Sequence, residues 1–255
     1  MSAPLSLGPA RPVPLSAVNP IAQLSAIAVL TVVLLVSGDL LTPVIVLAAE
    51  LALLPAAGLT RPAAILRRTW PLLLSAAGVA WVNVAFGSLS GADAWLSGAT
   101  WGLRVIALAL PGILLVASTD PVRLADALTL HWRVPTRFAY GALAALRLVP
   151  LLASEWETIR LARRARGMES RTPVAAVRLL AGTAFALLVA AIRRGTRLAT
   201  AMDARGFDSG VPRTNARGST LHPRDAWFVI ATVAVCAVAV ILSVVTGSWS
   251  PALAG

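Results

Sequence analysis

The chain has 255 residues, of which 58% are apolar and 13% charged, with a mean hydropathy of +0.80. A soluble domain is about 45–50% apolar and about 25% charged, so this composition excludes an ordinary soluble enzyme of this size. All 22 basic residues are arginine. The absence of lysine excludes a P-loop nucleotide site and Schiff-base chemistry within this chain.

Residues that commonly hold metals or cofactors are few and widely separated. The chain has one cysteine, Cys236, in an apolar run, and two histidines, His131 and His222, about ninety residues apart. These spacings match no zinc, iron–sulfur or disulfide pattern. We therefore expect no metal site, no cofactor and no catalytic residues.

Five apolar runs have the length of a bilayer span, which needs about 20 residues. They cover about residues 18–36, 40–58, 70–88, 99–118 and 226–246. The first two runs are separated only by Ser37–Asp39, so we expect an antiparallel helical hairpin there. At the start of the fourth run, Gly98 and Gly102 have the spacing of a helix-packing motif.

The arginines favour one orientation in the membrane. Arg11 precedes the first run, Arg61, Arg67 and Arg68 lie between the second and third, and 17 of the 22 arginines fall between Arg123 and Arg224. The connections at 37–39 and 87–97 contain none. Because arginine accumulates in cytoplasmic loops, we expect a multi-pass membrane protein with a cytoplasmic N-terminus and an external C-terminus.

The arginine-rich segment contains two expected helices. Apolar residues at helical spacing predict one over Thr136–Arg166, with a bend at Pro150. The second is expected to begin at Thr172-Pro173, a capping residue followed by proline, and to end at Ala204-Arg205-Gly206. Its apolar run of 14 residues, 179–192, is shorter than a bilayer span, so we expect it along the inner membrane surface or under the membrane bundle.

Both expected helices end in the same tripeptide, Ala165-Arg166-Gly167 and Ala204-Arg205-Gly206. Glycine closes a helix in the left-handed conformation, and arginine meets the negative end of the helix dipole. A narrow tip of this kind can present a guanidinium to carboxylates in a groove of a partner. The alternative is that Ala-Arg-Gly has no binding role and is only a common helix ending in an arginine-rich chain.

Two ionisable residues, Glu50 and Arg104, lie inside expected spans. Such residues are costly in a bilayer and suggest function. Three readings are open: a buried structural pair, two separate side chains that reach the interface, or a role in transport.

Several segments, in order over nearly the whole chain, form a recognisable pattern: Asn19–Leu24, Ser118–Pro121 through Ala127-Leu128 to Pro135, Arg147–Pro150 with Glu155, Ala162–Gly167 and Ala201–Phe207. In these segments the sequence resembles the transmembrane T component of energy-coupling factor transporters, the EcfT/CbiQ family. Gln23 and Ser118 depart from that pattern, where the family often has Lys and Thr.

The resemblance implies a non-catalytic scaffold that couples two cytosolic ABC-type ATPase subunits to a small membrane S component, which binds a vitamin or a transition-metal ion. It assigns the ATPase contact to Ala165, Arg166, Gly167, Ala204, Arg205 and Gly206. As supporting residues of the coupling helices it gives Arg147, Pro150, Glu155, Arg163 and Asp203. It also implies the bacterial cytoplasmic membrane as the location.

We therefore expect an all-α integral membrane protein with about five transmembrane helices and a cytoplasmic module of two long crossing helices. The expected domains are a four-helix membrane bundle (1–118), the coupling module (119–223) and a C-terminal membrane helix (224–255). The alternative function is a permease subunit of another ABC transporter type, which forms the substrate path itself. A membrane enzyme and a nucleic-acid-binding protein fit less well, because the sequence has no catalytic cluster and no exposed aromatic platform.

Overall fold

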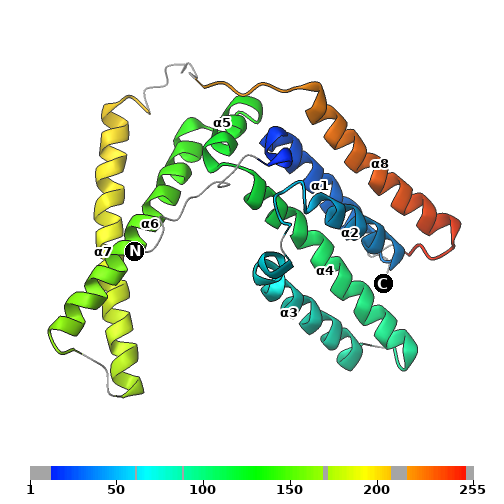
Figure 1. Cartoon of the computed structure of the whole chain (residues 1–255), viewed down its shortest axis with the longest axis horizontal. Coiled ribbons are helices and arrows are strands. Elements are labelled where there is room, and N and C mark those ends of the chain that lie inside the picture. Colours follow the sequence, from blue (N-terminus) through cyan, green and yellow to red (C-terminus); the bar gives the residue numbers. More distant parts are fainter. Residues whose placement is uncertain (1–12, 61, 88, 169–171, 208–216, 251–255) are drawn as a thin grey trace. The chain divides into compact units, whose positions relative to one another are not determined.

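The structure is a computed structural model that describes residues 13–60, 62–87, 89–168, 172–207 and 217–250. Arg11 and Arg61, which entered the orientation argument, lie outside these residues. The described chain is helical (Figure 1). Its elements are η1 (Pro14–Ala17), α1 (Pro20–Val36), α2 (Leu41–Leu53), α3 (Pro62–Phe86), α4 (Ala92–Ser118), α5 (Pro121–His131), α6 (Thr136–Ala165), α7 (Pro173–Ala204) and α8 (Pro223–Val245).

The chain forms two compact units. Within the described residues, the bundle unit comprises residues 13–127 and 219–250, and the helix-pair unit comprises residues 128–207 with 217–218. Helices α1 to α4 and α8 belong to the bundle unit, and α6 and α7 belong to the helix-pair unit. The division expected at residues 118 and 223 stays a prediction.

The core of the bundle unit is built around α4, which packs against α1, α2 and α3. One buried cluster joins Leu15 and Leu54 to Leu110 and Leu114 of α4. A second joins Leu34 of α1 and Val46 of α2 to Ala107 of α4. Ala107 is small and fully buried, so it allows the two neighbouring helices to approach α4 closely.

The chain reverses between α1 and α2. Leu34 near the end of α1 shares a cluster with Val46 near the start of α2, and Ile27 lines the same small cavity as Glu50 and Leu53 further on. Asp39 fixes the turn, since its carboxylate accepts hydrogen bonds from the backbone N–H of Thr42 at 2.7 Å and from its hydroxyl. The expected antiparallel hairpin is confirmed.

Helices α3 and α4 pack through small residues. A Cβ atom at Gly98 would lie 2.8 Å from the carbonyl oxygen of Ala80, and one at Gly102 would lie 3.2 Å from that of Ala76. A larger residue at Gly98 would therefore collide with the backbone of α3. The packing role expected for the Gly98/Gly102 spacing is confirmed.

Five helices are long and apolar enough to cross a membrane by length and composition, as expected, but two members of the set differ. The five are the part of α3 from Ile65 to Phe86, and the helices α4, α6, α7 and α8. Helices α6 and α7 thus take the place of the first two expected spans. The first two expected spans correspond to shorter helices, α1 with 17 residues and α2 with 13. The apolar run at 179–192 lies within the 32 residues of α7, so its own length does not limit the reach of the helix.

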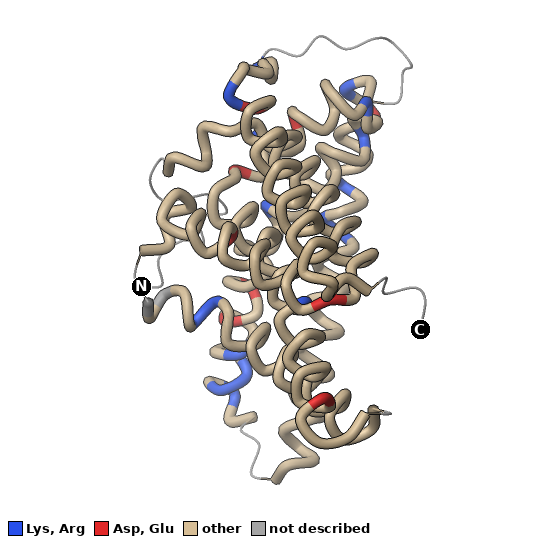
Figure 2. The backbone as a smooth tube through the Cα atoms, turned by 90° about the vertical axis from the view of Figure 1, so that its right-hand side faces the viewer, with Lys and Arg blue, Asp and Glu red and all other residues tan. Residues whose placement is uncertain are grey.

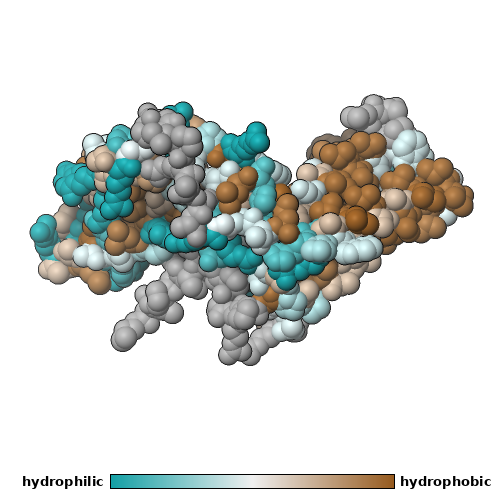
Figure 3. Space-filling view, turned by 90° about the horizontal axis from the view of Figure 1, so that it is seen from above, coloured by the Kyte–Doolittle hydropathy of each residue, from teal (hydrophilic) through white to brown (hydrophobic). Residues whose placement is uncertain are grey.

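The outer surface of the bundle unit is apolar along α8. Figure 3 shows a continuous hydrophobic surface there, and its large exposed residues are Trp227, Ile230, Val233, Val238, Ile241, Leu242, Val244 and Val245. Figure 2 shows long stretches of the backbone without any charged residue. A soluble monomer rarely exposes so large an apolar surface, so this face is suited to lipid.

Glu50 and Arg104 are both 3% exposed but do not form a pair. Neither oxygen of Glu50 has a hydrogen-bond partner among the described residues, and it lines a cavity of about 40 Å³. Arg104 donates to the carbonyl oxygen of Ser37, lies 4.6 Å from the centre of the Trp101 ring and interacts electrostatically with Asp39. The structural pair of Glu50 with Arg104 is therefore excluded, and Arg104 supports the α1–α2 turn.

Candidate coupling site

Helix α6 ends in a closed, exposed tip. Arg166 is the C-cap residue, with φ −87° and ψ 9°, and Gly167 follows with φ 71°. The N–H of Gly167 donates to the carbonyl of Arg164 at 2.9 Å, and the N–H of Met168 donates to that of Arg163 at 3.1 Å. These two bonds form the Schellman motif that a glycine at this position favours. We call Ala165, Arg166 and Gly167 the first tip.

Helix α7 ends in the same way. Arg205 is the C-cap residue, with φ −89° and ψ 9°, and Gly206 follows with φ 72°. Gly206 donates to the carbonyl of Asp203 at 2.9 Å, and Phe207 donates to that of Met202 at 3.2 Å. We call Ala204, Arg205 and Gly206 the second tip. The predicted helix ends are confirmed, and their backbone geometry agrees within a few degrees.

The start of α7 also follows the sequence-based prediction. Thr172 is the N-cap residue, and its hydroxyl accepts a hydrogen bond from the N–H of Ala175 at 3.3 Å. Pro173 occupies the first helical position, where its missing N–H leaves no intrahelical bond unmade. Helix α6 continues through Pro150, so the proline does not end the helix.

Helices α6 and α7 cross as an antiparallel pair (Figure 1). Three contacts give the register. The end of α6 meets the first third of α7 through Arg163 and Thr183, the middles meet through Glu155 and Arg194, and the start of α6 meets the segment just after α7 through Tyr140 and Phe207. The two tips therefore lie at opposite ends of the pair. Arg163 lies opposite Thr183, so about 25 residues of α7 separate the levels of the two tips, which is roughly 38 Å along the pair.

Arg163 holds the first end of the pair. Its Nη1 donates to the carbonyl oxygen of Leu179 at 2.8 Å and to the hydroxyl oxygen of Thr183 at 2.7 Å. Thr183 is 3% exposed. Hydrogen bonds from a charged donor to partly buried acceptors are among the stronger ones in proteins. The resemblance named Arg163 as a supporting residue, and the structure gives it a supporting contact.

The middle of the pair contains an ion pair between Glu155 and Arg194. Their Oε2 and Nη1 atoms are 2.7 Å apart but are not aligned as a hydrogen bond. Both side chains are about one-third exposed, so water screens the attraction. Sequence reasoning did not single out Arg194 as the partner of Glu155, because only the crossing of the helices brings the two together.

The second end is held by aromatic packing. The rings of Tyr140 and Phe207 are 6.5 Å apart with an interplanar angle of 79°, the edge-to-face arrangement that aromatic pairs favour. Arg147 and Arg205 line one groove of about 520 Å³ beside this contact. Asp203 lines another of about 400 Å³ with Arg137. The tip is thus flanked by hollows that bear charged side chains.

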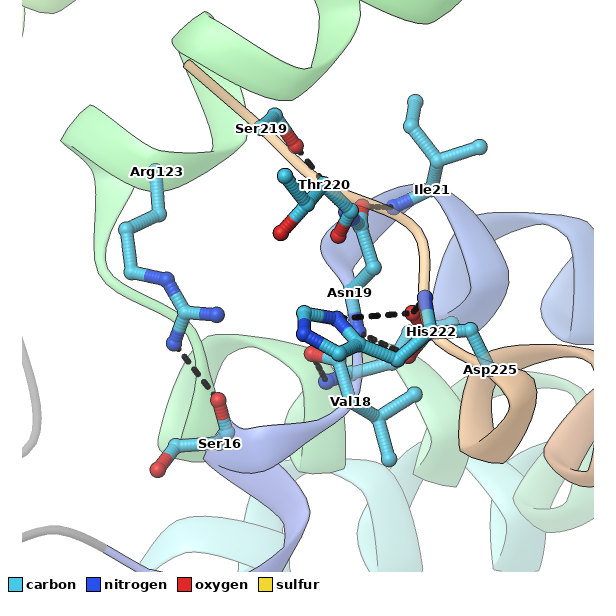
Figure 4. A network of polar contacts seen from close by, with 10 residues as sticks. Ser16, Val18, Asn19, Ile21, Arg123, Ser219, Thr220, His222 and Asp225 are labelled. Atoms are coloured by element: carbon cyan, nitrogen blue, oxygen red, sulfur yellow. Dashed lines mark hydrogen bonds and ion pairs between the residues drawn. The ribbon is translucent and has the colours of Figure 1, made fainter. Parts of the chain in front are cut away.

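A polar network ties together the entry to α1 and α8, where the Asn19–Leu24 segment lies (Figure 4). The N–H of Asn19 donates to Oδ1 of Asp225 at 2.7 Å, and the Asn19 amide donates to the hydroxyl of Ser219 at 2.9 Å. The N–H of His222 donates to Oδ2 of the same Asp225 at 2.7 Å. Asp225 therefore fixes the start of α8 against the start of α1, a role that the sequence did not reveal.

Gln23 performs a similar task one turn further along α1. Its amide donates to the carbonyls of Leu15 and Val18, and its Oε1 accepts from the hydroxyls of Ser118 and Thr119 at 3.1 and 3.3 Å. A neutral amide can both donate and accept, so it satisfies all four neighbours. The two departures from the family pattern, Gln23 and Ser118, are thus hydrogen-bonded to each other.

No group of three or more His, Cys, Asp or Glu side chains that could hold a metal ion lies within the described parts of the chain. The geometry of the helix pair is that of a rigid element with two matching, exposed, cationic ends. Each end presents an arginine that can bind an acidic groove.

Comparison with known proteins gives one family. A family model, CbiQ, described as cobalt transport protein, matches residues 13–215. The chain is 35% identical over 142 residues to an energy-coupling factor transporter transmembrane protein EcfT of Exiguobacterium sibiricum, which is 52% of this chain and 54% of that protein. It is also 35% identical over 144 residues to the EcfT of Limosilactobacillus fermentum, with 53% and 54% covered.

One of the similar proteins is much longer than this chain. The chain is 29% identical over 160 residues to a Bifidobacterium longum protein that carries the name of an ABC transporter ATP-binding protein, covering 59% of this chain and 20% of that protein. The chain spans about half the length of the EcfT proteins it matches. Because the family model covers most of its residues, the chain belongs to the CbiQ family of cobalt transport proteins.

Proposed function

We propose that this protein is the transmembrane coupling subunit of an energy-coupling factor importer. In this proposal two cytosolic ABC-type ATPase subunits bind the first and second tips, and a small membrane S component delivers a vitamin or a transition-metal ion. The observation that carries the proposal is the pair of matching Arg-bearing helix ends on one antiparallel helix pair.

The distance between the tips supports two binding partners. Roughly 38 Å is too far for one groove to receive both arginines, but it suits two similar subunits that each receive one. The matching φ and ψ values of Arg166 and Arg205 let the same groove recognise either end. The names of the relatives agree with this, since they include both transporter membrane proteins and an ATP-binding protein.

The tips would act as mechanical contacts. ATP binding draws the partner subunits together, and the grooves that hold Arg166 and Arg205 move with them. Because the Schellman bonds and the inter-helix contacts make the pair stiff, its ends transmit this movement to the membrane-embedded helices. Hydrolysis belongs to the partners in this scheme, and the chain itself is non-catalytic.

The interior of the bundle unit favours this scheme over a permease that forms the path itself. The buried cavity beside Glu50 has a volume of about 40 Å³, which is enough for one or two waters. Its lining is mostly apolar, with Gln23, Glu50 and Thr232 as the polar exceptions. A vitamin would not fit in this cavity, which agrees with substrate binding by the S component.

We place the protein in the bacterial cytoplasmic membrane with the N-terminus and both tips on the cytoplasmic side. The support comes from the concentration of 17 arginines between Arg123 and Arg224 and from the apolar helices of the structure. Only on that side could the tips meet ATPase subunits.

The test is charge reversal at both tips. Arg166→Glu with Arg205→Glu should leave the protein in the membrane but remove co-expressed ATPase subunits from a pull-down, because carboxylates then face carboxylates. The matched control is Arg193→Glu with Arg197→Glu, which changes the same charge on exposed residues of α7 away from the tips. If the tip variant keeps the ATPases at the yield of the control, the proposal is wrong.

A further inference from the structure

A second basic pocket lies on the helix pair, between the last turns of α6 and the first turns of α7. Its volume is about 580 Å³. Its described lining combines three arginines with mainly apolar neighbours: Trp156, Arg160, Arg163, Arg164, Met168, Ala176, Leu179, Leu180 and Thr183. The lining differs from that of the tips, where one arginine projects from a helix end.

The wall of the pocket is built before any ligand arrives. Arg163 is fixed by its bonds to Leu179 and Thr183, and its guanidinium lies 3.4 Å from the point where a Cβ atom of residue 182 would be. Gly182 therefore leaves room for the guanidinium. The arrangement keeps Arg163 in place whether or not Arg160 and Arg164 are engaged.

Arg160 and Arg164 are four residues apart and so lie on the same face of α6, beside Arg163. The Nη1 atom of Arg160 lies 3.8 Å from Oε2 of Glu157. This ion pair is weak because both side chains are about half exposed to water. None of the described lining residues is acidic. The mouth of the pocket therefore carries a positive charge that a phosphate can neutralise through several N–H groups.

The rest of the pocket is suited to a hydrocarbon chain. Leu180 is 55% exposed and Met168 is 49% exposed. Val174 and Val177, in the same first turns of α7, are also exposed, and the helix is apolar enough to contact lipid. Trp156 at the rim has the aromatic character that is enriched at the headgroup level of membranes.

We propose that this pocket binds an anionic phospholipid. Arg160 and Arg164 hold the headgroup phosphate, Arg163 completes the basic wall, and an acyl chain lies along Leu180 and the exposed apolar residues of α7. The charge selects an anionic lipid, and the apolar surface beside it selects a lipid over a free anion. The bound lipid would steady the base of the first tip.

The test uses purified full-length protein, stripped of lipid and titrated with phosphatidylglycerol or with phosphatidylcholine of the same chain length, with binding followed by native mass spectrometry. The test variant is Arg160→Gln with Arg164→Gln, and the matched control is Arg193→Gln with Arg197→Gln. The wild type and the control should prefer phosphatidylglycerol. The test variant should bind it about 25-fold more weakly, because each basic residue near an anionic surface contributes about a factor of five.

Inorganic phosphate distinguishes a lipid from a free anion. Millimolar phosphate should not displace phosphatidylglycerol, since the acyl chain also contributes to binding. Displacement would indicate a free-anion site and overturn the proposal. Equal binding of the two lipids, or equal losses in test and control variants, would overturn it as well.

ATPase recovery separates this inference from the coupling function. The Arg160→Gln/Arg164→Gln variant should retain the ATPase subunits in the pull-down and elute from a sizing column like the wild type. If it loses the ATPases and keeps phosphatidylglycerol, the pocket is a protein interface and the lipid assignment is wrong. Failure of the tip experiment leaves the lipid measurement unaffected.

Discussion

The two tips have the same backbone geometry but different support. Arg166 and Arg205 differ by 2° in φ, and Gly167 and Gly206 differ by 1°. Behind the first tip, the polar contacts of Arg163 hold α6 to α7. Behind the second, the edge-to-face contact of Phe207 with Tyr140 does so.

The comparison teaches that the shape of the tip and the means of holding it are independent. The Ala-Arg-Gly sequence determines the helix end locally, through one left-handed glycine. The contacts that position the ends differ: the first end is held by Leu179 and Thr183 of α7, and the second by Tyr140 of α6. We therefore expect changes in the glycines to affect both tips alike, and changes in the supports to affect one tip each.

The largest effect is expected from Gly167→Val with Gly206→Val. No neighbouring atom lies within 4 Å of a Cβ at residue 167, so the cost there comes from the positive φ, about 2 kcal/mol for a β-branched residue. The tips are far apart, so the two costs should add. Recovery of ATPase subunits should fall more than tenfold.

Asparagine provides the control for the glycine variants, because it tolerates the left-handed conformation. Gly167→Asn with Gly206→Asn should retain most of the ATPase recovery. If the valine and asparagine variants behave alike, the left-handed closure is not what the partner requires.

Arg163→Gln should loosen the first tip alone. It removes two hydrogen bonds from a charged donor, which together contribute about 2–3 kcal/mol. Hydrogen exchange should become faster at residues 160–168 and stay unchanged at 200–207. Equal acceleration at both ends would show that the supports are not independent.

Phe207→Ala should loosen the second tip alone, with a smaller effect. An edge-to-face aromatic pair contributes about 0.5–1.5 kcal/mol beyond the burial of its surface. Exchange should become faster at residues 200–206. Phe185→Ala, which truncates an exposed phenylalanine within α7, serves as the control and should leave exchange unchanged at both ends.

Glu155→Gln should have the smallest effect and act on both tips equally. The ion pair with Arg194 lies midway along the helices and is about one-third exposed, so its contribution is at most about 1 kcal/mol. A double-mutant cycle with Arg194→Gln measures it directly. A coupling energy well above this value would mean that the crossing point, and not the ends, holds the pair together.

The sequence predicted what depends on local chemistry. Thr172-Pro173 and the two Ala-Arg-Gly tripeptides place helix boundaries correctly because caps and left-handed glycines act within one turn. The packing of Gly98 and Gly102 against α3 was also predicted, since small residues at that spacing have few other uses in a membrane helix.

What depended on the crossing of helices could not be predicted. Arg194 pairs with Glu155 and Tyr140 packs on Phe207 only because α6 and α7 are antiparallel with a particular register. The same reason explains why Arg104 supports the turn at Ser37 instead of pairing with Glu50. The second expected span proved shorter because the apolar composition continues through Leu54–Ala57, past the end of α2.

The central claim, that the two helix ends contact the ATPase subunits, is tested most directly by crosslinking in cells. A photoreactive amino acid replaces Ala165 or Ala204, each beside its tip arginine, or the exposed Val116 of α4 as a control. We predict a crosslinked product with an ATPase subunit from both tip positions and none from Val116. Absence of an ATPase product from both tips, in cells where the complex still assembles, would contradict the account.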